Sequence, residues 1–266
     1  MDSLKHVLWI GGPSGSGKTT VGRRIARRHG LRWYNSDAHT WSHRDRALSQ
    51  GHPGAELFER LSPAERAAAG PADMLAMSLH VERGQMTVDD LRALPATPLI
   101  LAEGTQITPE IVGPDGCAIW LTLSAEQQRE RLDRRHGAEG APPSYLAFRK
   151  IIEAEIGDDP RVLDVDDLTM DETIAAVEGI FAERIAAGPS ATTPAERREI
   201  LRYANQIIVD QHLAWLRRWW TTGDPATMVR TFDCECGQPS CGARIDLALA
   251  DYPAEPLLAP GHQLST

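Results

Sequence analysis

The sequence has no long run of apolar residues, and its 28 basic residues are outnumbered by 37 acidic ones. Its longest apolar stretches, such as Pro98–Ala102 and Ala118–Leu123, are far shorter than the roughly 18 residues that a membrane span requires. The apolar stretch at Val7–Ile10 is also too short for the core of a signal peptide. A net charge of −9 argues against nucleic acid or an anionic membrane as the main partner. We therefore expect a cytoplasmic protein that does not enter the membrane.

Lysine and cysteine are also scarce. Lys5, Lys18 and Lys150 are the only lysines among 28 basic residues, so Lys18 stands out in its local sequence. Of the four cysteines, three lie between positions 234 and 241. Cysteines this close together in a chain expected in the cytoplasm favour a metal site over a disulfide. The content of 42% hydrophobic and 24% charged residues is that of a globular protein, which excludes a collagen-like, coiled-coil or disordered chain.

The 266 residues suit one large domain with a small appendage. Short apolar segments alternate with helix-like segments, which predicts an α/β fold with a parallel five-stranded sheet flanked by helices. The expected strands are Lys5–Ile10, Leu31–Asn35, Leu99–Ala102, Ala118–Leu123 and Arg161–Val165. The expected helices are Lys18–His29, Ala125–His136, Ser144–Ile156 and Met170–Ala187, with a mostly helical insert at 55–94 that breaks at Pro63, Gly70–Pro71 and Gly84. The polar segment His39–Pro53 is expected to be a loop.

A small, polar, proline-containing stretch at Gly188–Pro194 predicts a domain boundary. We therefore expect a large domain over 1–188 and an extension over 189–266. Ala195–Thr221 is expected to form one long helix, with an apolar stripe of Leu201, Ala204, Ile208, Trp215 and Trp219. The tryptophans at 215, 219 and 220 are expected to cover the sheet, although a contact with a partner is an alternative. Residues 222–266 have little helical pattern and carry the cysteine cluster.

The segment Gly12–Thr19 matches the phosphate-binding pattern G-x-x-x-x-G-K-[ST] at every fixed position. The glycines let backbone N–H groups turn toward phosphates, Lys18 neutralises their charge, and the Thr19 hydroxyl is placed to bind Mg²⁺. An apolar strand precedes the loop and an amphipathic helix follows it, so a chance glycine-rich turn is the weaker reading. The sequence therefore predicts an ATP–Mg²⁺ site. Its expected nucleotide-binding residues are Gly12, Ser14, Gly15, Ser16, Gly17, Lys18, Thr19 and Thr20.

Two carboxylates follow expected strands, Asp37 after the second and Glu103 at the end of the third. In a doubly wound sheet, strand ends beside the phosphate loop line the ligand crevice. Asp37 there can accept a proton from an attacking hydroxyl or hold Mg²⁺ through water, unless it only forms a turn. Glu103 can orient Mg²⁺-bound water or bind substrate, unless it is a solvated strand end. His39 and Arg44 lie near the expected crevice and are candidate substrate contacts.

The expected helix from residue 125 is rich in arginine. Arg131 and Arg135 share one of its faces at a spacing of four residues. A loop with glycine and proline, Gly137–Pro143, follows the helix, so the segment 129–143 is predicted to be a mobile lid. Arginines on a closing lid can stabilise charge on a transferring phosphoryl group. A solvated arginine face is the alternative, and we prefer it for Arg129.

This order of strands, phosphate loop, insert and arginine-rich lid resembles the small P-loop kinases of the gluconate and shikimate kinase type. The resemblance covers about residues 5–187, and Asp37–Trp41 and Glu103–Pro109 are similar to actinobacterial members of that superfamily. It implies an ATP-dependent kinase with a P-loop kinase fold, in which Lys18, Asp37 and Arg135 are catalytic. It places Asp37 near the acceptor hydroxyl, Arg131 near the nucleotide and Arg135 on the lid.

The acceptor implied by this resemblance is a hydroxyl of a small polar metabolite or natural product. The paired arginines and the Gly-Gly stretch of shikimate kinase are absent, and the lid of gluconate kinase is incomplete, so the acceptor itself does not carry over. A kinase of nucleic-acid ends is disfavoured by the net charge. The remaining alternative is a nucleotide-gated interaction protein that acts through residues 189–266, a region that a minimal small-molecule kinase does not need.

Three thiols lie within eight residues in the pattern Cys234-x-Cys236-Gly237-x₃-Cys241. Zinc prefers four ligands in a tetrahedron, and thiolates suit it. The pattern is similar to the C-x-C-x₄-C zinc motif appended to SET-domain methyltransferases, which implies a structural Zn²⁺ and says nothing about methyl transfer. The candidates for a fourth ligand are, in order, His212, Cys117 and His262. Unligated thiols, or a disulfide between two of them, are the alternative.

Overall fold

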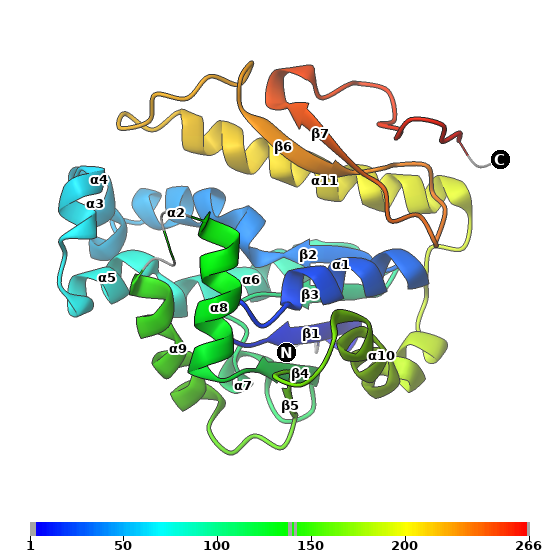
Figure 1. The fold of residues 1–266 in the computed structure, drawn as a ribbon, viewed down its shortest axis with the longest axis horizontal. Helices are drawn as coiled ribbons and strands as arrows, with labels where there is room; N and C mark the ends of the chain where they lie inside the picture. Colours follow the sequence, from blue (N-terminus) through cyan, green and yellow to red (C-terminus); the bar gives the residue numbers. More distant parts are fainter. Residues whose placement is uncertain (1–3, 138–139, 141–142, 265–266) are drawn as a thin grey trace. The chain divides into compact units, whose positions relative to one another are not determined.

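The computed structural model describes residues 4–137, 140 and 143–264 and divides into two compact units (Figure 1). The first unit combines Met1–Ser36 with Thr87–Ser190, and the second combines Asp37–Met86 with Ala191–Thr266. The predicted boundary near residue 188 therefore adjoins a junction between the units. Most of the predicted insert at 55–94 belongs to the same unit as the C-terminal region. Within the described residues, no helix is both long and apolar enough to cross a bilayer.

The first unit is built on a five-stranded, fully parallel sheet in the order β2-β3-β1-β4-β5. The strands are β1 (Val7–Gly11), β2 (Arg32–Asn35), β3 (Ile100–Glu103), β4 (Cys117–Thr122) and β5 (Val162–Asp164). All five were predicted, with ends that differ by one or two residues. The predicted α/β fold with a parallel five-stranded sheet is confirmed.

Helices cover both faces of this sheet, because side chains alternate across each strand. Leu8, Ile10 and Leu121 pack on one side with residues of α1 and α10, such as Ile25 and Phe181. Residues on the other side, such as Trp9 and Trp120, pack with residues of α6 (His80–Ala93) and α9 (Pro143–Ile156). The helices of this unit are α1 (Lys18–His29), α7 (Pro109–Val112), α8 (Ala125–His136), α9 (Pro143–Ile156) and α10 (Met170–Ala187). The predicted bounds of α1, α8 and α10 are confirmed.

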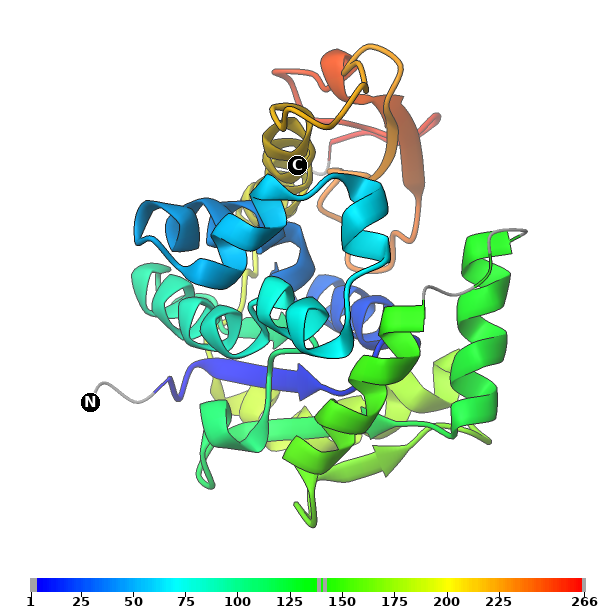
Figure 2. The same cartoon turned by 90° about the vertical axis from the view of Figure 1, so that its left-hand side faces the viewer.

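The second unit contains a run of short helices, a long helix and a β-hairpin. The elements are η1 (Ser36–His39), α2 (Thr40–Ser49), α3 (Pro53–Arg60), α4 (Pro63–Ala67), α5 (Pro71–Ser78), α11 (Pro194–Leu216), β6 (Val229–Asp233), β7 (Arg244–Ala248) and η3 (Leu249–Asp251), with α6 (His80–Ala93) crossing the division. Strands β6 and β7 pair antiparallel, a hairpin that the sequence analysis missed. Figure 2 shows α2 beside α11, against which it packs.

Three predictions about these helices were wrong. The expected loop at 39–53 contains α2, because packing of buried residues such as Ala47 overrides its polar composition. Gly84 lies inside α6, where one glycine costs only about 1 kcal/mol, and the break falls instead at Leu79, which has a φ of 55°. Helix α11 ends at Leu216, before the predicted end at Thr221. Its buried face is rotated relative to the predicted apolar stripe, because the buried residues are Ile200, Leu201, Asn205, Val209 and Ala214.

The tryptophans after α11 pack within the second unit, where we had expected contacts with the sheet. The Trp220 ring lies 5.8 Å from Trp41 and 6.0 Å from Phe58, measured between ring centroids. The Arg66 guanidinium lies over the rings of both Phe58 and Trp220, 4.0 Å from the centroid of each ring. Trp219, by contrast, is 66% exposed. These aromatic–arginine contacts attach the segment after β2 to the C-terminal region.

Candidate active site

The loop between β1 and α1 has the backbone geometry of a phosphate-binding loop. Gly12, Gly15 and Gly17 have φ angles of 125°, 89° and 94°, in the left-handed region that favours glycine. A Cβ on Gly12 would lie 2.1 Å from the carbonyl oxygen of Leu121, so no larger residue fits there. The Lys18 side chain is buried and donates a hydrogen bond of 2.8 Å to the Pro13 carbonyl. The loop therefore curls around the lysine ammonium and ends at the N-terminus of a helix, which favours a bound anion.

Helix α8 supports this loop through side chains. Gln128 donates from Nε2 to the Ser14 carbonyl at 2.9 Å, and Arg131 donates to the Val165 carbonyl at 3.0 Å and the Gly15 carbonyl at 3.4 Å. Arg131 thus lies beside the phosphate loop, and its expected place near the nucleotide stays a prediction. Gln128 is fully buried and was missed, because nothing in the local sequence marks a glutamine that contacts a loop so distant along the chain.

Arg135 lies one turn further along α8 and is exposed. Its role on a lid stays a prediction, since part of the predicted lid, residues 138–139 and 141–142, lies outside the described residues. Arg134 makes an i,i+4 ion pair with Glu130 at 2.6 Å. For Arg134, this pair favours the alternative that the arginines form a solvent-exposed face of the helix.

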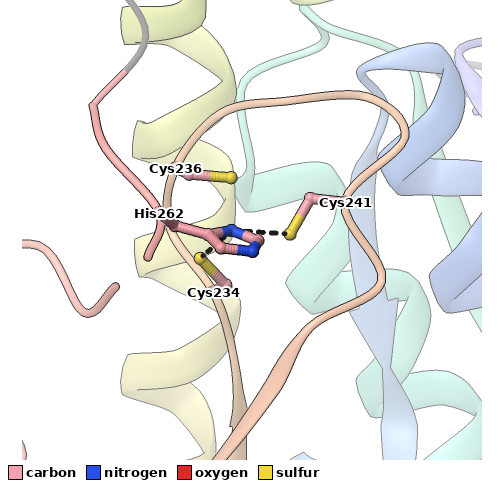
Figure 3. Close-up of side chains that lie close together, drawn as sticks. All are labelled: Cys234, Cys236, Cys241 and His262. Atoms are coloured by element: carbon pink, nitrogen blue, oxygen red, sulfur yellow. Dashed lines mark hydrogen bonds between the residues drawn. The ribbon is translucent and has the colours of Figure 1, made fainter. Parts of the chain in front are cut away.

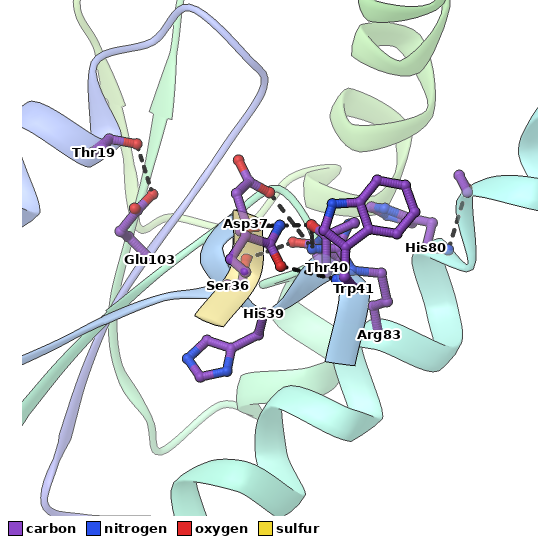
Figure 4. Close-up of polar contacts among 12 residues, drawn as sticks. Thr19, Ser36, Asp37, His39, Thr40, Trp41, His80, Arg83 and Glu103 are labelled. Atoms are coloured by element: carbon purple, nitrogen blue, oxygen red, sulfur yellow. Dashed lines mark hydrogen bonds and ion pairs between the residues drawn. The ribbon is translucent and has the colours of Figure 1, made fainter. Parts of the chain in front are cut away.

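Glu103 and Thr19 point toward each other at the end of β3 (Figure 4). The Thr19 hydroxyl donates to Oε2 of Glu103 at 3.3 Å, and Glu103 is 1% exposed. The alternative of a solvated strand end is therefore wrong. A hydroxyl and a carboxylate are hard oxygen ligands of the kind that Mg²⁺ prefers. The pair fits a magnesium site, and it favours the metal role that we considered for Glu103 over direct substrate binding.

Gly22 allows this pair to form. A Cβ at this position would lie 2.9 Å from Cδ2 of Leu101 and 3.4 Å from Cγ of Glu103. The absence of a side chain lets α1 approach β3 closely, which brings Thr19 to the carboxylate. Gly22 was not predicted to matter here, because a single glycine in a predicted helix carries no signal by itself.

Asp37 begins the second unit, two residues after the end of β2. Its side chain is 61% exposed, and its carboxylate lies 3.7 Å from Nη2 of Arg83, which also donates to the Thr40 hydroxyl at 2.8 Å (Figure 4). Gln211 of α11 donates to the Asp37 carbonyl at 2.8 Å and accepts from the Trp41 amide at 3.0 Å. The backbone around Asp37 is thus held by the C-terminal helix while its carboxylate faces solvent.

The two candidate substrate residues after Asp37 differ in their surroundings. The His39 ring is half-buried and stacks on His43, with ring centroids 5.9 Å apart. Arg44 is 4% exposed, lies 3.6 Å above the Phe58 ring and donates to the Met77 carbonyl at 2.8 Å. Burial and the nearby charge of Arg83 lower the pKa of Arg44. The structure corrects the expectation for Arg44, which packs in the interior of its unit and is not an accessible substrate contact.

The predicted metal-binding cysteines come together, and the fourth residue beside them is His262 (Figure 3). The first-ranked candidate, His212, is not part of this group, and its Nδ1 lies 2.8 Å from the Ile208 carbonyl within its own helix. Burial lowers the pKa of His212. Cys117 lies in β4 of the first unit and is not part of this group.

No family model matches the chain. Among curated proteins, it is 26% identical over 228 residues to a cytidylate kinase of Nocardia farcinica (strain IFM 10152), a match that covers 68% of this chain and 96% of the relative. It is 24% identical over 231 residues to a cytidylate kinase of Rhodococcus jostii (strain RHA1), covering 71% of this chain and 100% of the relative. The chain is similar to kinases.

Solved structures with similar folds include two small-molecule kinases. A gluconokinase from Sinorhizobium meliloti 1021 matches with a TM-score of 0.43 and 19% identity, over 69% of this chain and 95% of its own. A shikimate kinase from Acinetobacter baumannii in complex with shikimate matches with a TM-score of 0.39 and 18% identity, over 68% of this chain and 93% of its own. The assignment of the fold rests on the strand order and the phosphate loop described above.

Proposed function

We propose that this protein is an ATP-dependent phosphotransferase that acts on a small polar acceptor. The observation that carries the proposal is the complete phosphate loop, with a buried Lys18 and with Thr19 hydrogen-bonded to a buried carboxylate at the end of β3. The curated relatives named above are kinases, and their length is covered almost completely, which supports the same reaction class.

The proposal assigns roles to the phosphate loop and to several polar residues outside it. The backbone N–H groups of Gly12–Thr19 and the Lys18 ammonium bind the phosphates of ATP. Thr19 and Glu103 would hold Mg²⁺, which neutralises charge on the β- and γ-phosphates when bound. Arg131, beside the loop, and Arg135 stabilise the charge that spreads over the transferring phosphoryl group. Asp37 accepts the proton of an acceptor hydroxyl, with His39 as a second acceptor contact.

A nucleoside monophosphate is a second candidate acceptor, favoured by the names of the curated relatives, cytidylate kinases. The two acceptors make different chemical demands. A hydroxyl must lose its proton as it attacks, so it needs a base such as Asp37. A phosphate monoester is already largely a dianion at pH 7, because its second pKa is about 6, and it needs cations more than a base. Arg83, which contacts the Asp37 carboxylate, would supply such a cation.

A panel of acceptors tests the proposed reaction. The full chain is incubated with ATP and Mg²⁺ and with sugar acids, polyols, hydroxylated natural products, CMP, dCMP and UMP. We expect one class to gain the mass of one phosphoryl group with matching formation of ADP. Tight ATP binding without phosphorylated product across both classes would instead favour the nucleotide-gated interaction protein.

Replacing Glu103 by glutamine is expected to weaken the response to magnesium. The change keeps the shape of the side chain and removes the charge beside the Thr19 hydroxyl. We expect the Mg²⁺ concentration at half-maximal activity to rise roughly 10- to 100-fold, the range typical of removing a side chain that orients the ligands of a metal. Magnesium titrations at fixed ATP measure this rise. Glu110→Gln, an exposed glutamate of α7, is the control and should leave the titration unchanged. An unchanged titration for Glu103→Gln would remove Glu103 from the metal site.

Gln211→Ala is expected to slow the reaction without weakening ATP binding. It removes the two hydrogen bonds to the backbone of Asp37 and Trp41. Small misplacements of a reacting group are costly, roughly 10²-fold for 1 Å, so we expect a fall in kcat of about tenfold. Steady-state kinetics and ATP titration separate the two effects. Gln206→Ala is the matched control, because Gln206 lies on the same helix and bonds only to Asp210 at 3.0 Å among the contacts we describe. Equal effects of the two changes would refute a positioning role for Gln211.

A further inference from the structure

Three thiols and one imidazole gather at one end of the β6–β7 hairpin (Figure 3). Cys234 directly follows β6, Cys236 and Cys241 lie in the connection to β7, and His262 comes from the segment after η3. Their four potential ligand atoms all lie within 4.8 Å of one another. All three cysteines are buried, and none is in a disulfide. Four groups of this chemistry have therefore been brought together from a short loop and a distant part of the tail.

Two distances within this cluster match the edges of a zinc tetrahedron. Nδ1 of His262 lies 3.4 Å from Sγ of Cys234 and 3.5 Å from Sγ of Cys241. With Zn–S near 2.3 Å and Zn–N near 2.0 Å, the sulfur-to-nitrogen edge of a tetrahedron is about 3.5 Å. The imidazole is thus already at the distance from two of the thiols that one shared zinc ion would impose.

The backbone supplies a hydrogen-bond donor to one of the thiols. The backbone amide of Ala259 donates to Sγ of Cys234 at 3.3 Å. An outer hydrogen bond of this kind orients a metal ligand and stabilises its charge.

The residue between two of the cysteines faces the other way and joins the cluster to α11. Glu235 is fully buried, and its Oε1 accepts hydrogen bonds of 2.7 Å from Asn205 and 2.7 Å from the Tyr252 hydroxyl. Its Oε2 accepts from the Leu257 amide at 3.0 Å and lies 3.2 Å from Nη1 of Arg202. The chain through the cluster is therefore bound on one side by helix α11 and on the other by the tail.

We propose that Cys234, Cys236, Cys241 and His262 bind one structural zinc ion that ties the C-terminal tail to the hairpin. A soft set of three sulfurs and one nitrogen suits zinc, and four protein ligands leave no open position for catalysis. After η3, the described part of the tail buries little apolar surface, with Leu257 and Ala259 as its buried apolar residues, so a metal would add to the hydrogen bonds that hold it. Metal binding supplies folding free energy in such a segment.

Metal analysis of the full chain tests the proposal directly. Protein purified without chelator should contain about one zinc ion per chain, as a single four-ligand site requires. After exchange with Co²⁺, its absorption should show a tetrahedral site with three thiolate ligands. A metal-free chain whose tail resists proteolysis, or a cobalt spectrum that is octahedral or shows fewer than three thiolates, would overturn the proposal.

Paired variants identify the ligands. His262→Ala should lose zinc or change the cobalt spectrum, whereas His212→Ala should leave both unchanged. Cys236→Ser should release zinc and expose the tail to protease, whereas Cys117→Ser should retain it. If His262→Ala kept the metal and an unchanged spectrum, His262 would not be a ligand. ATP binding should persist in all four variants, which makes this test independent of the proposed kinase reaction.

Discussion

Lys18→Ala is expected to lose most phosphoryl transfer, by roughly 10²–10³-fold in kcat, the cost typical of removing one preorganised donor from a developing charge. Lys18 is buried in the phosphate loop, and its ammonium faces a loop carbonyl, Pro13, and not the apolar core. Its loss should therefore leave the sheet intact. The measurements are the rate of product formation under saturating ATP and the temperature of thermal unfolding.

Two further variants make this result interpretable. Lys18→Met keeps the aliphatic part of the side chain and should be as inactive as Lys18→Ala, since only the charge matters for transfer. Lys150→Ala removes an exposed lysine of α9 and should retain full activity. Full activity in Lys18→Met together with a normal unfolding temperature would contradict the proposed kinase reaction.

Asp37→Asn is expected to slow transfer to a hydroxyl by roughly 10²–10⁴-fold, the usual cost of losing a general base. The asparagine keeps the size of the side chain, and the exposed position of Asp37 makes a large change in stability unexpected. ATP affinity should stay the same, because the residues proposed to bind phosphate lie in the loop after β1. Rapid-quench kinetics at saturating ATP and acceptor measure the chemical step. Asp73→Asn, an exposed aspartate of α5, is the control for charge alone.

The size of this effect also separates the two candidate acceptors. A nucleoside monophosphate brings its own anionic oxygen, so Asp37→Asn should then cost far less than for a hydroxyl. Arg83→Gln, which removes the cation beside Asp37, should in that case raise the KM for the acceptor. If Asp37→Asn unfolds the protein, Asp37 is structural and its proposed role as a base fails.

The sequence alone determined the fold of the first unit and the phosphate loop. Strand and helix signals there are local, since each buried strand is a short apolar run and each helix carries its own face and end signals. The loop is also local, because the glycines, Lys18 and Thr19 lie within one short segment between a strand and the helix that follows it. Local patterns of this kind do not depend on contacts with distant residues, which is why β1 to β5 and α1, α8 and α10 were predicted correctly.

Only the tertiary structure decided which distant side chains meet. Helix α2 was predicted to be a loop, because its polar sequence becomes helical only when residues such as Trp41 and Ala47 pack on neighbouring helices. Gln211 reaches Asp37, and His262 rather than His212 reaches the three cysteines, through contacts between residues far apart in the chain. No sequence period encodes such pairings, because each depends on the path of the whole chain between the partners. The local structure of the first unit was therefore predictable, and the assembly of the second unit was not.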